Sequence, residues 1–137
     1  MQIHLQRQLS VAIENAPGRL AAVSALLADR GINIEALCVI NNVEQGMLRM
    51  LVSDAAAARG ILESAGFPVI EADVLNVELT DRLGKLARVA AALAAANINI
   101  EYAYATVDHA GARTRMVLKT THSRKALHLL ETLQEES

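Results

Sequence analysis

The amino-acid sequence predicts an α+β protein made of two βαββαβ units, and three observations carry that prediction. They are an internal repeat, an alternation of strand-like and helix-like hydrophobic patterns, and a short turn that opens the first helix of each unit. A βαββαβ unit places two helices on one face of a four-stranded antiparallel sheet, the ferredoxin-like arrangement. We expect the two units to lie side by side, the second without its last strand.

The repeat has an offset of 66 residues. Segment 11–36 aligns without gaps on segment 77–102, and 12 of the 26 positions are identical. The identities include a glycine and the block Ile-Asn-Ile-Glu, which chance does not supply in a chain rich in alanine and leucine. One unit has therefore been duplicated, and we expect a first domain over 1–72 and a second over 73–137.

In the first copy, apolar residues alternate with polar or small ones over 3–13, which predicts a half-buried strand. Residues 15–18 have the sequence Asn-Ala-Pro-Gly, which is turn chemistry. They open into a helix with one apolar stripe, formed by Leu20, Val23, Leu26 and Leu27. Gly31 can end this helix in the left-handed conformation, and Asn97 can do the same in the second copy.

The rest of the chain follows the same order. The expected elements are strands over 33–40 and 47–52, a helix over 55–65 capped by Asp54, a strand over 67–80, a helix over 85–96, strands near 98–107 and 113–120, and a helix after Ser123 with Ala126, Leu127, Leu130 and Leu133 on its buried face. The second copy thus lacks a fourth strand, and its sheet has an open edge. We expect the long N-terminal strand to cover that edge, in cis or across a dimer.

Composition argues against several classes of function. Net charge is −2 without a basic track, and the only aromatic residues are Phe67, Tyr102 and Tyr104, so nucleic acid is not an expected partner. No apolar run reaches the roughly 18 residues of a membrane span, and residues 1–9 show no signal-peptide core. We expect a cytoplasmic protein without a membrane partner. Cys38 is the single cysteine, and we expect it to be a small buried hydrophobe.

Reactive side chains are not grouped in patterns that support catalysis. The four histidines, His4, His109, His122 and His128, have no carboxylate at metal-ligand spacing, and we expect them to face solvent. The sequence shows no nucleophile with a base and an acid, and no glycine-rich phosphate loop. We therefore expect a protein that is not an enzyme and that uses no metal and no cofactor.

The turn that opens each first helix is the candidate binding site. Asn15-x-Pro-Gly-x-Leu20 and Asp81-x-x-Gly-x-Leu86 place an oxygen-bearing side chain at a strand end and a glycine at a helix N-terminus. Free N–H groups and the helix dipole favour a carboxylate there, although simple capping by the two polar residues is the alternative. Asn33 and Asn99 follow 18 residues after these polar residues. Within a unit they begin a strand away from the turn, but across an interface the positions can converge.

These motifs resemble the ACT domain. ENAPGRL with LADRGINIEAL carries the resemblance in the first copy, and DRLGKL with ANINIEY carries it in the second, so that the whole chain looks like a stand-alone tandem-ACT protein. The resemblance implies a regulatory module that binds a free amino acid, or a similar small carboxylate, at an interface between ACT domains. It also implies a homodimer and a partner enzyme of amino-acid metabolism. GINIEAL is similar to the regulatory subunit of acetolactate synthase too, which keeps a ligand-independent interaction subunit as the alternative.

The resemblance also implies which residues bind the ligand. They are Asn15, Ala16, Pro17, Gly18, Arg19, Leu20 and Asn33 in the first copy, and Asp81, Arg82, Leu83, Gly84, Lys85, Leu86 and Asn99 in the second. In this scheme Asn15 and Asp81 bind the polar head of the amino acid. Leu83 departs from the expected proline, and Ile13 and Leu79 stand where some members have a histidine. Because the charge of Asp81 favours an ammonium group, we expect any asymmetry to favour the second site.

Overall fold

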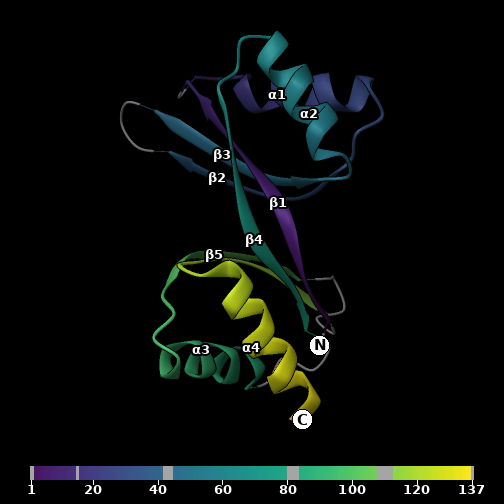
Figure 1. Ribbon diagram of the computed structural model, residues 1–137. Coiled ribbons are helices and arrows are strands. Elements are labelled where there is room, and N and C mark those ends of the chain that lie inside the picture. Colours follow the sequence, from purple (N-terminus) through teal and green to yellow (C-terminus); the bar gives the residue numbers. More distant parts are fainter. Residues whose placement is uncertain (1, 15, 42–44, 80–83, 108–112, 137) are drawn as a thin grey trace. The chain divides into compact units, whose positions relative to one another are not determined.

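The computed structural model describes residues 2–14, 16–41, 45–79, 84–107 and 113–136 (Figure 1). The elements are β1 (Gln2–Ile13), α1 (Arg19–Asp29), β2 (Ile34–Asn41), β3 (Gly46–Val52), α2 (Ala55–Ser64), β4 (Val69–Leu79), α3 (Lys85–Ala95), β5 (Ile100–Val107), β6 (Thr114–Thr120) and α4 (Ser123–Glu136). This order confirms the expected α+β fold with two βαββαβ patterns. The chain divides into two compact units, which we call the first unit (residues 7–72) and the second unit (residues 73–137 with residues 1–6).

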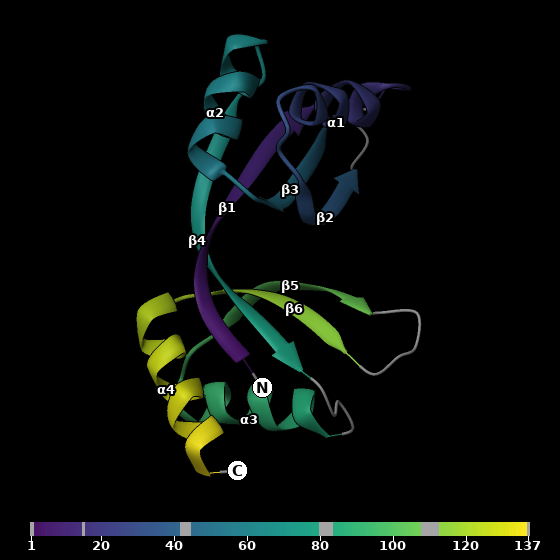
Figure 2. The same cartoon turned by 90° about the vertical axis from the view of Figure 1, so that its right-hand side faces the viewer.

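The sheet of the first unit has the strand order β2-β3-β1-β4. β1 and β3 pair antiparallel with Leu9 opposite Met50 and Val11 opposite Leu48, while β2 pairs with the other edge of β3. Helices α1 and α2 cover one face of this sheet (Figure 2). This is the ferredoxin-like arrangement that the alternating hydrophobic pattern predicts.

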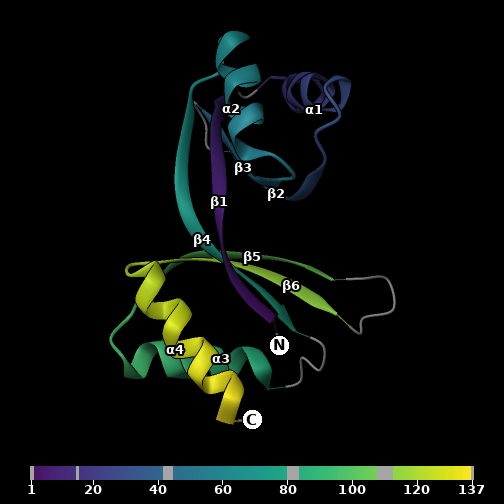
Figure 3. The same cartoon turned by 45° about the vertical axis from the view of Figure 1, so that its right-hand side comes forward.

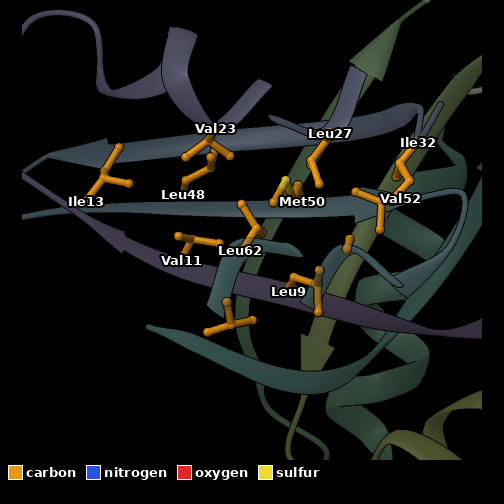
Figure 4. Packing of buried hydrophobic residues seen from close by; sticks show 12 residues of the cluster. Leu9, Val11, Ile13, Val23, Leu27, Ile32, Leu48, Met50, Val52 and Leu62 are labelled. Atoms are coloured by element: carbon orange, nitrogen blue, oxygen red, sulfur yellow. The ribbon is translucent and has the colours of Figure 1, made fainter. Parts of the chain in front are cut away.

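The core of the first unit lies between that sheet face and the two helices. Side chains from β1 and β3 point toward residues of both helices, so the apolar layer lies between the sheet on one side and the helices on the other (Figure 4). The buried cluster consists of Leu9, Val11, Ile13, Val23, Leu27, Ile32, Leu48, Met50, Val52, Ala58, Leu62 and Val69. Aliphatic side chains make up nearly the whole layer, as the scarcity of aromatic residues requires.

The second unit has the equivalent order β5-β6-β4-β1, with helices α3 and α4 on one face of its sheet (Figure 3). Its buried cluster consists of Leu75, Val77, Leu79, Val89, Leu93, Ile98, Met116, Leu118, Ala126 and Leu130, with Leu127 and Leu133 partly buried against it. The predicted buried face of the last helix is thus confirmed. The fourth strand of this sheet is the start of β1, residues 2–6.

Packing and an amide contact, in addition to the hydrogen bonds with β4, hold that strand segment in the second unit. Ile3 and Leu5 pack against the core cluster, and Asn76 Nδ2 donates a hydrogen bond to Gln6 Oε1 at 2.9 Å. The open edge expected from the sequence is therefore covered in cis by the beginning of the same chain.

Ion pairs join the fourth strand of the first unit to β1 and α2, in addition to its hydrogen bonds with β1 and the burial of Val69. Glu71 on β4 accepts a hydrogen bond from Arg7 on β1 at 2.8 Å, and Arg59 of α2 lies 3.0 Å from the same carboxylate oxygen. Arg59 also donates to Glu63, one helical turn further on, at 2.9 Å. The hydrogen bond from Arg7, followed by the positive charge of Arg59, holds the pKa of Glu71 below its usual value.

Several local predictions are confirmed. Asp54 caps α2 by accepting a hydrogen bond from Ala57 N–H at 3.1 Å. Gly31 (φ 73°) and Asn97 (φ 59°) both adopt the left-handed conformation after a helix. One expectation needs correction, because Cys38 is half-buried rather than buried. Leu20, on the apolar stripe of α1, is 39% exposed and lines a surface hollow.

Candidate functional site

The two helix-opening turns have the same backbone conformation. Gly18 precedes α1 with φ 84° and ψ −1°, and Gly84 precedes α3 with φ 79° and ψ −12°. A side chain at either position is strained in this left-handed region, which explains why both copies have glycine there. Each glycine carbonyl accepts the first helical hydrogen bond, at 2.9 Å from Ala22 and 3.0 Å from Arg88. The first-turn N–H groups have no carbonyl partner within the helix.

A hollow of about 300 Å³ lies at the turn of the first unit. Its lining comes from the end of β1, the turn, the first residues of α1 and the edge strand β2, and consists of Ile13, Glu14, Ala16, Gly18, Arg19, Leu20, Ala21 and Val39. The volume is at the lower end of the range of about 300–1,000 Å³ that is common for small-molecule sites. The turn of the first unit can therefore accommodate a small metabolite.

Glu14 and Arg19 form the polar wall of this hollow. Arg19 Nη2 donates to Glu14 Oε2 at 2.9 Å, so the ion pair bridges the turn from the end of β1 to the start of α1. The side chains are 75% and 42% exposed respectively, which leaves both charged groups accessible to a ligand. In so exposed a pair the net stabilisation is small, and a ligand can compete for either partner at little cost.

A second hollow of about 570 Å³ in the first unit is lined in part by the same ion pair. It shares Ile13, Glu14 and Arg19 with the hollow at the turn, and its remaining lining is Ala12, Gln45, Ala65, Gly66, Phe67 and Pro68. The ion pair thus contributes to the lining of two concave surfaces.

Four of the sequence-predicted residues line the hollow at the turn: Ala16, Gly18, Arg19 and Leu20. Pro17 is exposed beside them. In the second unit, Gly84, Lys85 and Leu86 begin α3, and Leu86 is 52% exposed. Asn15, Asp81, Arg82 and Leu83 lie outside the described residues.

Asn33 and Asn99 lie away from the turns of their own units. Each follows a helix of 11 residues, which separates it from the turn by about 16 Å. Their backbones make matching contacts, because Asn33 N–H donates to Ser53 Oγ at 3.0 Å and Asn99 N–H donates to Thr121 Oγ1 at 3.2 Å. Both asparagine side chains are exposed, where a second chain could reach them.

The sequence alone missed Ile13, Glu14, Ala21 and Val39 as lining residues. One signal was present, since Glu14 and Arg19 are oppositely charged residues on either side of the turn motif. Val39 carried no such signal, because only the course of β2 brings it beside the turn.

Other kinds of site find no support among the described residues. His4, His122 and His128 are exposed as expected, and His109 lies outside the described part. Within that part, no three histidine, cysteine or acidic side chains gather as metal ligands would. In the same residues, no helix combines the length and the apolar character of a membrane span.

Comparison with known proteins identifies the family. The model of the ACT domain pair matches residues 1–134, so the chain belongs to the ACT domain pair family, whose fold is a regulatory module. No match to a curated protein is found.

Solved structures agree with this assignment. The chain is similar to protein BT0572 from Bacteroides thetaiotaomicron, with 32% identity, a TM-score of 0.88 and coverage of 96% of this chain and 90% of that one. It also has the fold of the ligand-free regulatory subunit of aspartate kinase from Thermus thermophilus (21% identity, TM-score 0.69, 95% of each chain). The corresponding subunit from Thermus flavus has 22% identity, a TM-score of 0.66 and 96% coverage of each chain.

Proposed function

We propose that this chain is a non-catalytic regulatory protein of the cytoplasm that binds a free amino acid at an interface between ACT domains and signals to a partner enzyme. The observation that carries the proposal is the hollow at the β1–α1 turn of a chain in this family. Its exposed Glu14–Arg19 pair presents one negative and one positive charge, which complement the ammonium and carboxylate groups of an amino acid. The duplicated segments 1–72 and 73–137 are the proposed ACT domains in sequence.

A second copy of the chain is the proposed partner that completes the interface. β2 is an edge strand, so one side of its backbone can pair with another strand. Leu37, Val39 and Ile40 on this strand are 37–45% exposed. Three large apolar side chains this close together favour burial against a partner. Pairing along β2 would bring Asn33 of one chain toward the turn of the other, and the ligand would then stabilise the pair that it bridges.

A thermal-shift screen with the twenty amino acids tests ligand binding. A ligand at ten times its dissociation constant should raise the melting temperature by about 3–6 °C, because it binds the native state alone. Light scattering with and without the ligand then reports the oligomeric state. If no amino acid shifts the melting temperature at millimolar concentration, the proposal fails.

A ligand-independent interaction subunit is the second candidate function. The exposed aliphatic side chains of β2, together with Leu86, favour it because they serve protein contacts without any metabolite. A stable complex with a partner enzyme, unchanged by amino acids and formed by a chain that binds none, would support this alternative.

Calorimetry of Asn15→Ala and Asp81→Ala tests which turn binds more tightly. The proposal adds these residues to the contacts with the polar head of the ligand, beside Glu14 and Arg19 in the first unit, and the negative charge of Asp81 favours the ammonium group. We expect the larger loss of affinity from Asp81→Ala. Equal losses would contradict this ranking, and no loss from either variant would remove both residues from the site.

A further inference from the structure

We infer that the hollow at the turn of the first unit selects amino acids with an uncharged aliphatic side chain, while Glu14 and Arg19 bind the two charged groups that all amino acids share. This inference rests on the proposed function and specifies the ligand class of one of its sites. It follows from the chemistry of the hollow lining and from a sequence difference between the two copies.

The side-chain lining of the hollow is mostly apolar. Ile13, Leu20 and Val39 contribute branched aliphatic groups from three different elements, and two alanines also line the hollow. Among the described lining residues, Glu14 and Arg19 are the only ones with a polar side chain. Once the head group of a ligand has engaged these two, the remaining side-chain lining is apolar, and burial of an aliphatic ligand side chain against it favours binding.

The ion pair fits a zwitterion better than a simple acid or amine. Arg19 has five donors in a planar fork, so it can hold a ligand carboxylate while it keeps a contact with Glu14. Glu14 can accept from the ligand ammonium group at the same time. A ligand with both charges therefore leaves the net charge of the site unchanged, whereas a ligand with one charge leaves one side-chain charge without a new partner.

The second copy does not repeat this combination. At the offset of 66 residues, Glu14 corresponds to Thr80 and Val39 corresponds to Ala105. The second copy thus lacks the acid of position 14 and one branched wall, and its acid, Asp81, stands one position further on, opposite Asn15 of the first copy. The selectivity is accordingly a property of the first unit, and substitutions there should change it.

Isothermal titration calorimetry of the full chain tests the inference with matched ligands. Valine and threonine have nearly the same shape and differ by a methyl group against a hydroxyl group, and we expect valine to bind about 10- to 100-fold more tightly. Lysine and aspartate should bind more weakly than valine. Isobutylamine and isovalerate, which each lack one charge of the head group, should bind at least about tenfold more weakly than valine.

Variants locate the effect in this hollow. Arg19→Gln should weaken valine binding about tenfold, whereas Arg30→Gln, the same change at the other end of α1, should leave it unchanged. Val39→Asp places a charge in the apolar wall, and it should lower the affinity for valine and raise that for lysine. Val39 is 37% exposed on an edge strand, so this variant is compatible with folding, which circular dichroism can verify.

The outcomes separate the inference from the function on which it rests. If threonine, lysine or aspartate binds as tightly as valine, the aliphatic selectivity is wrong while the amino-acid-binding function stands. If valine binds tightly and Arg19→Gln changes nothing, this hollow is not the selective site. If no amino acid binds at all, both the inference and the proposed function fail.

Discussion

The first unit takes its fourth strand from β4, the next strand along the chain, and ties it with the ion pairs of Glu71 to Arg7 and Arg59. The second unit takes its fourth strand from residues 2–6 and holds it with Ile3, Leu5 and the amide contact of Gln6 with Asn76. The same sheet order is thus completed by a later segment of the chain in the first unit and by an earlier segment in the second, and different side-chain contacts support the two strands. Duplication preserved the positions of the elements, while the side-chain contacts of the fourth strand diverged.

The two cores should be equally sensitive where the copies are equivalent. Leu27 and Leu93 stand at matching positions of the repeat, and both are 0% exposed. We expect Leu27→Ala and Leu93→Ala each to lower the free energy of unfolding by about 2–5 kcal/mol, through lost burial and a residual cavity. Chemical denaturation measures the size of the effect, and amide exchange shows which unit loses protection. A cost far larger in one unit would contradict the equivalence of the cores.

The apolar contacts that hold residues 2–6 in the second unit can be removed by substitutions of Ile3 and Leu5. We expect the double variant Ile3→Ala/Leu5→Ala to cost about 2–4 kcal/mol, less than two fully buried leucines because both side chains are only partly buried. The loss of amide protection should concentrate in α3, α4, β5 and β6. Gln2→Ala/His4→Ala changes the exposed positions that alternate with Ile3 and Leu5, and it should stay within about 0.5 kcal/mol. Similar effects of the two double variants would show that this strand is not held by its apolar face.

The ion pairs of Glu71 with Arg7 and Arg59 in the first unit should make the stability depend on pH. The pKa of Glu71 is lower in the folded chain than in the unfolded one, so its contribution is present above the unfolded pKa and is lost as pH falls. We expect the melting temperature of the wild type to fall between about pH 5 and pH 3, and Glu71→Gln to remove part of that fall.

Glu78→Gln is the matched control for this prediction in the second unit. The carboxylate of Glu78 lies 3.9 Å from Arg115, against 2.8 Å for Glu71 and Arg7, so its neutralisation should change the pH profile less. A larger change of the pH profile from Glu78→Gln than from Glu71→Gln would contradict the prediction that the ion pairs of Glu71 contribute more to stability.

The smallest expected effect distinguishes two neighbouring threonines of the second unit. Thr120 Oγ1 is buried without a hydrogen-bond partner, whereas Thr121 Oγ1 accepts from Asn99 N–H. We expect Thr120→Val to stabilise the chain by about 1 kcal/mol and Thr121→Val to destabilise it by about the same amount. Thermal unfolding of the two variants side by side measures both shifts. Destabilisation by Thr120→Val would mean that its hydroxyl is satisfied in solution.

Local rules account for much of what the sequence could predict. The glycine turns, the Asp54 cap, the left-handed Gly31 and Asn97, and the helix stripes each depend on residues close together in the chain. The open edge of the second sheet followed from counting strands, and the overlong first strand was the expected cover.

Long-range features of the site were harder to predict. Val39 joins Glu14 at the hollow only through the register of β2 in the sheet, and Ser53 and Thr121 meet their asparagines only after a strand pairing has formed. The assignment of ligand contacts to Asn15 and Asp81 stays a prediction. Contacts with a ligand or with a second chain leave no periodic pattern in the sequence of one chain.

The origin of the second unit's fourth strand also constrains the order of events during synthesis. Residues 7–72 form a continuous stretch and can fold as soon as they have left the ribosome. Residues 1–6 precede this stretch, yet their partners begin at residue 73 and extend to the last helix. At about 5–20 residues per second, Ile3 and Leu5 wait roughly 6–25 s for their sheet, and during that time their side chains are exposed to chaperones and to other nascent chains.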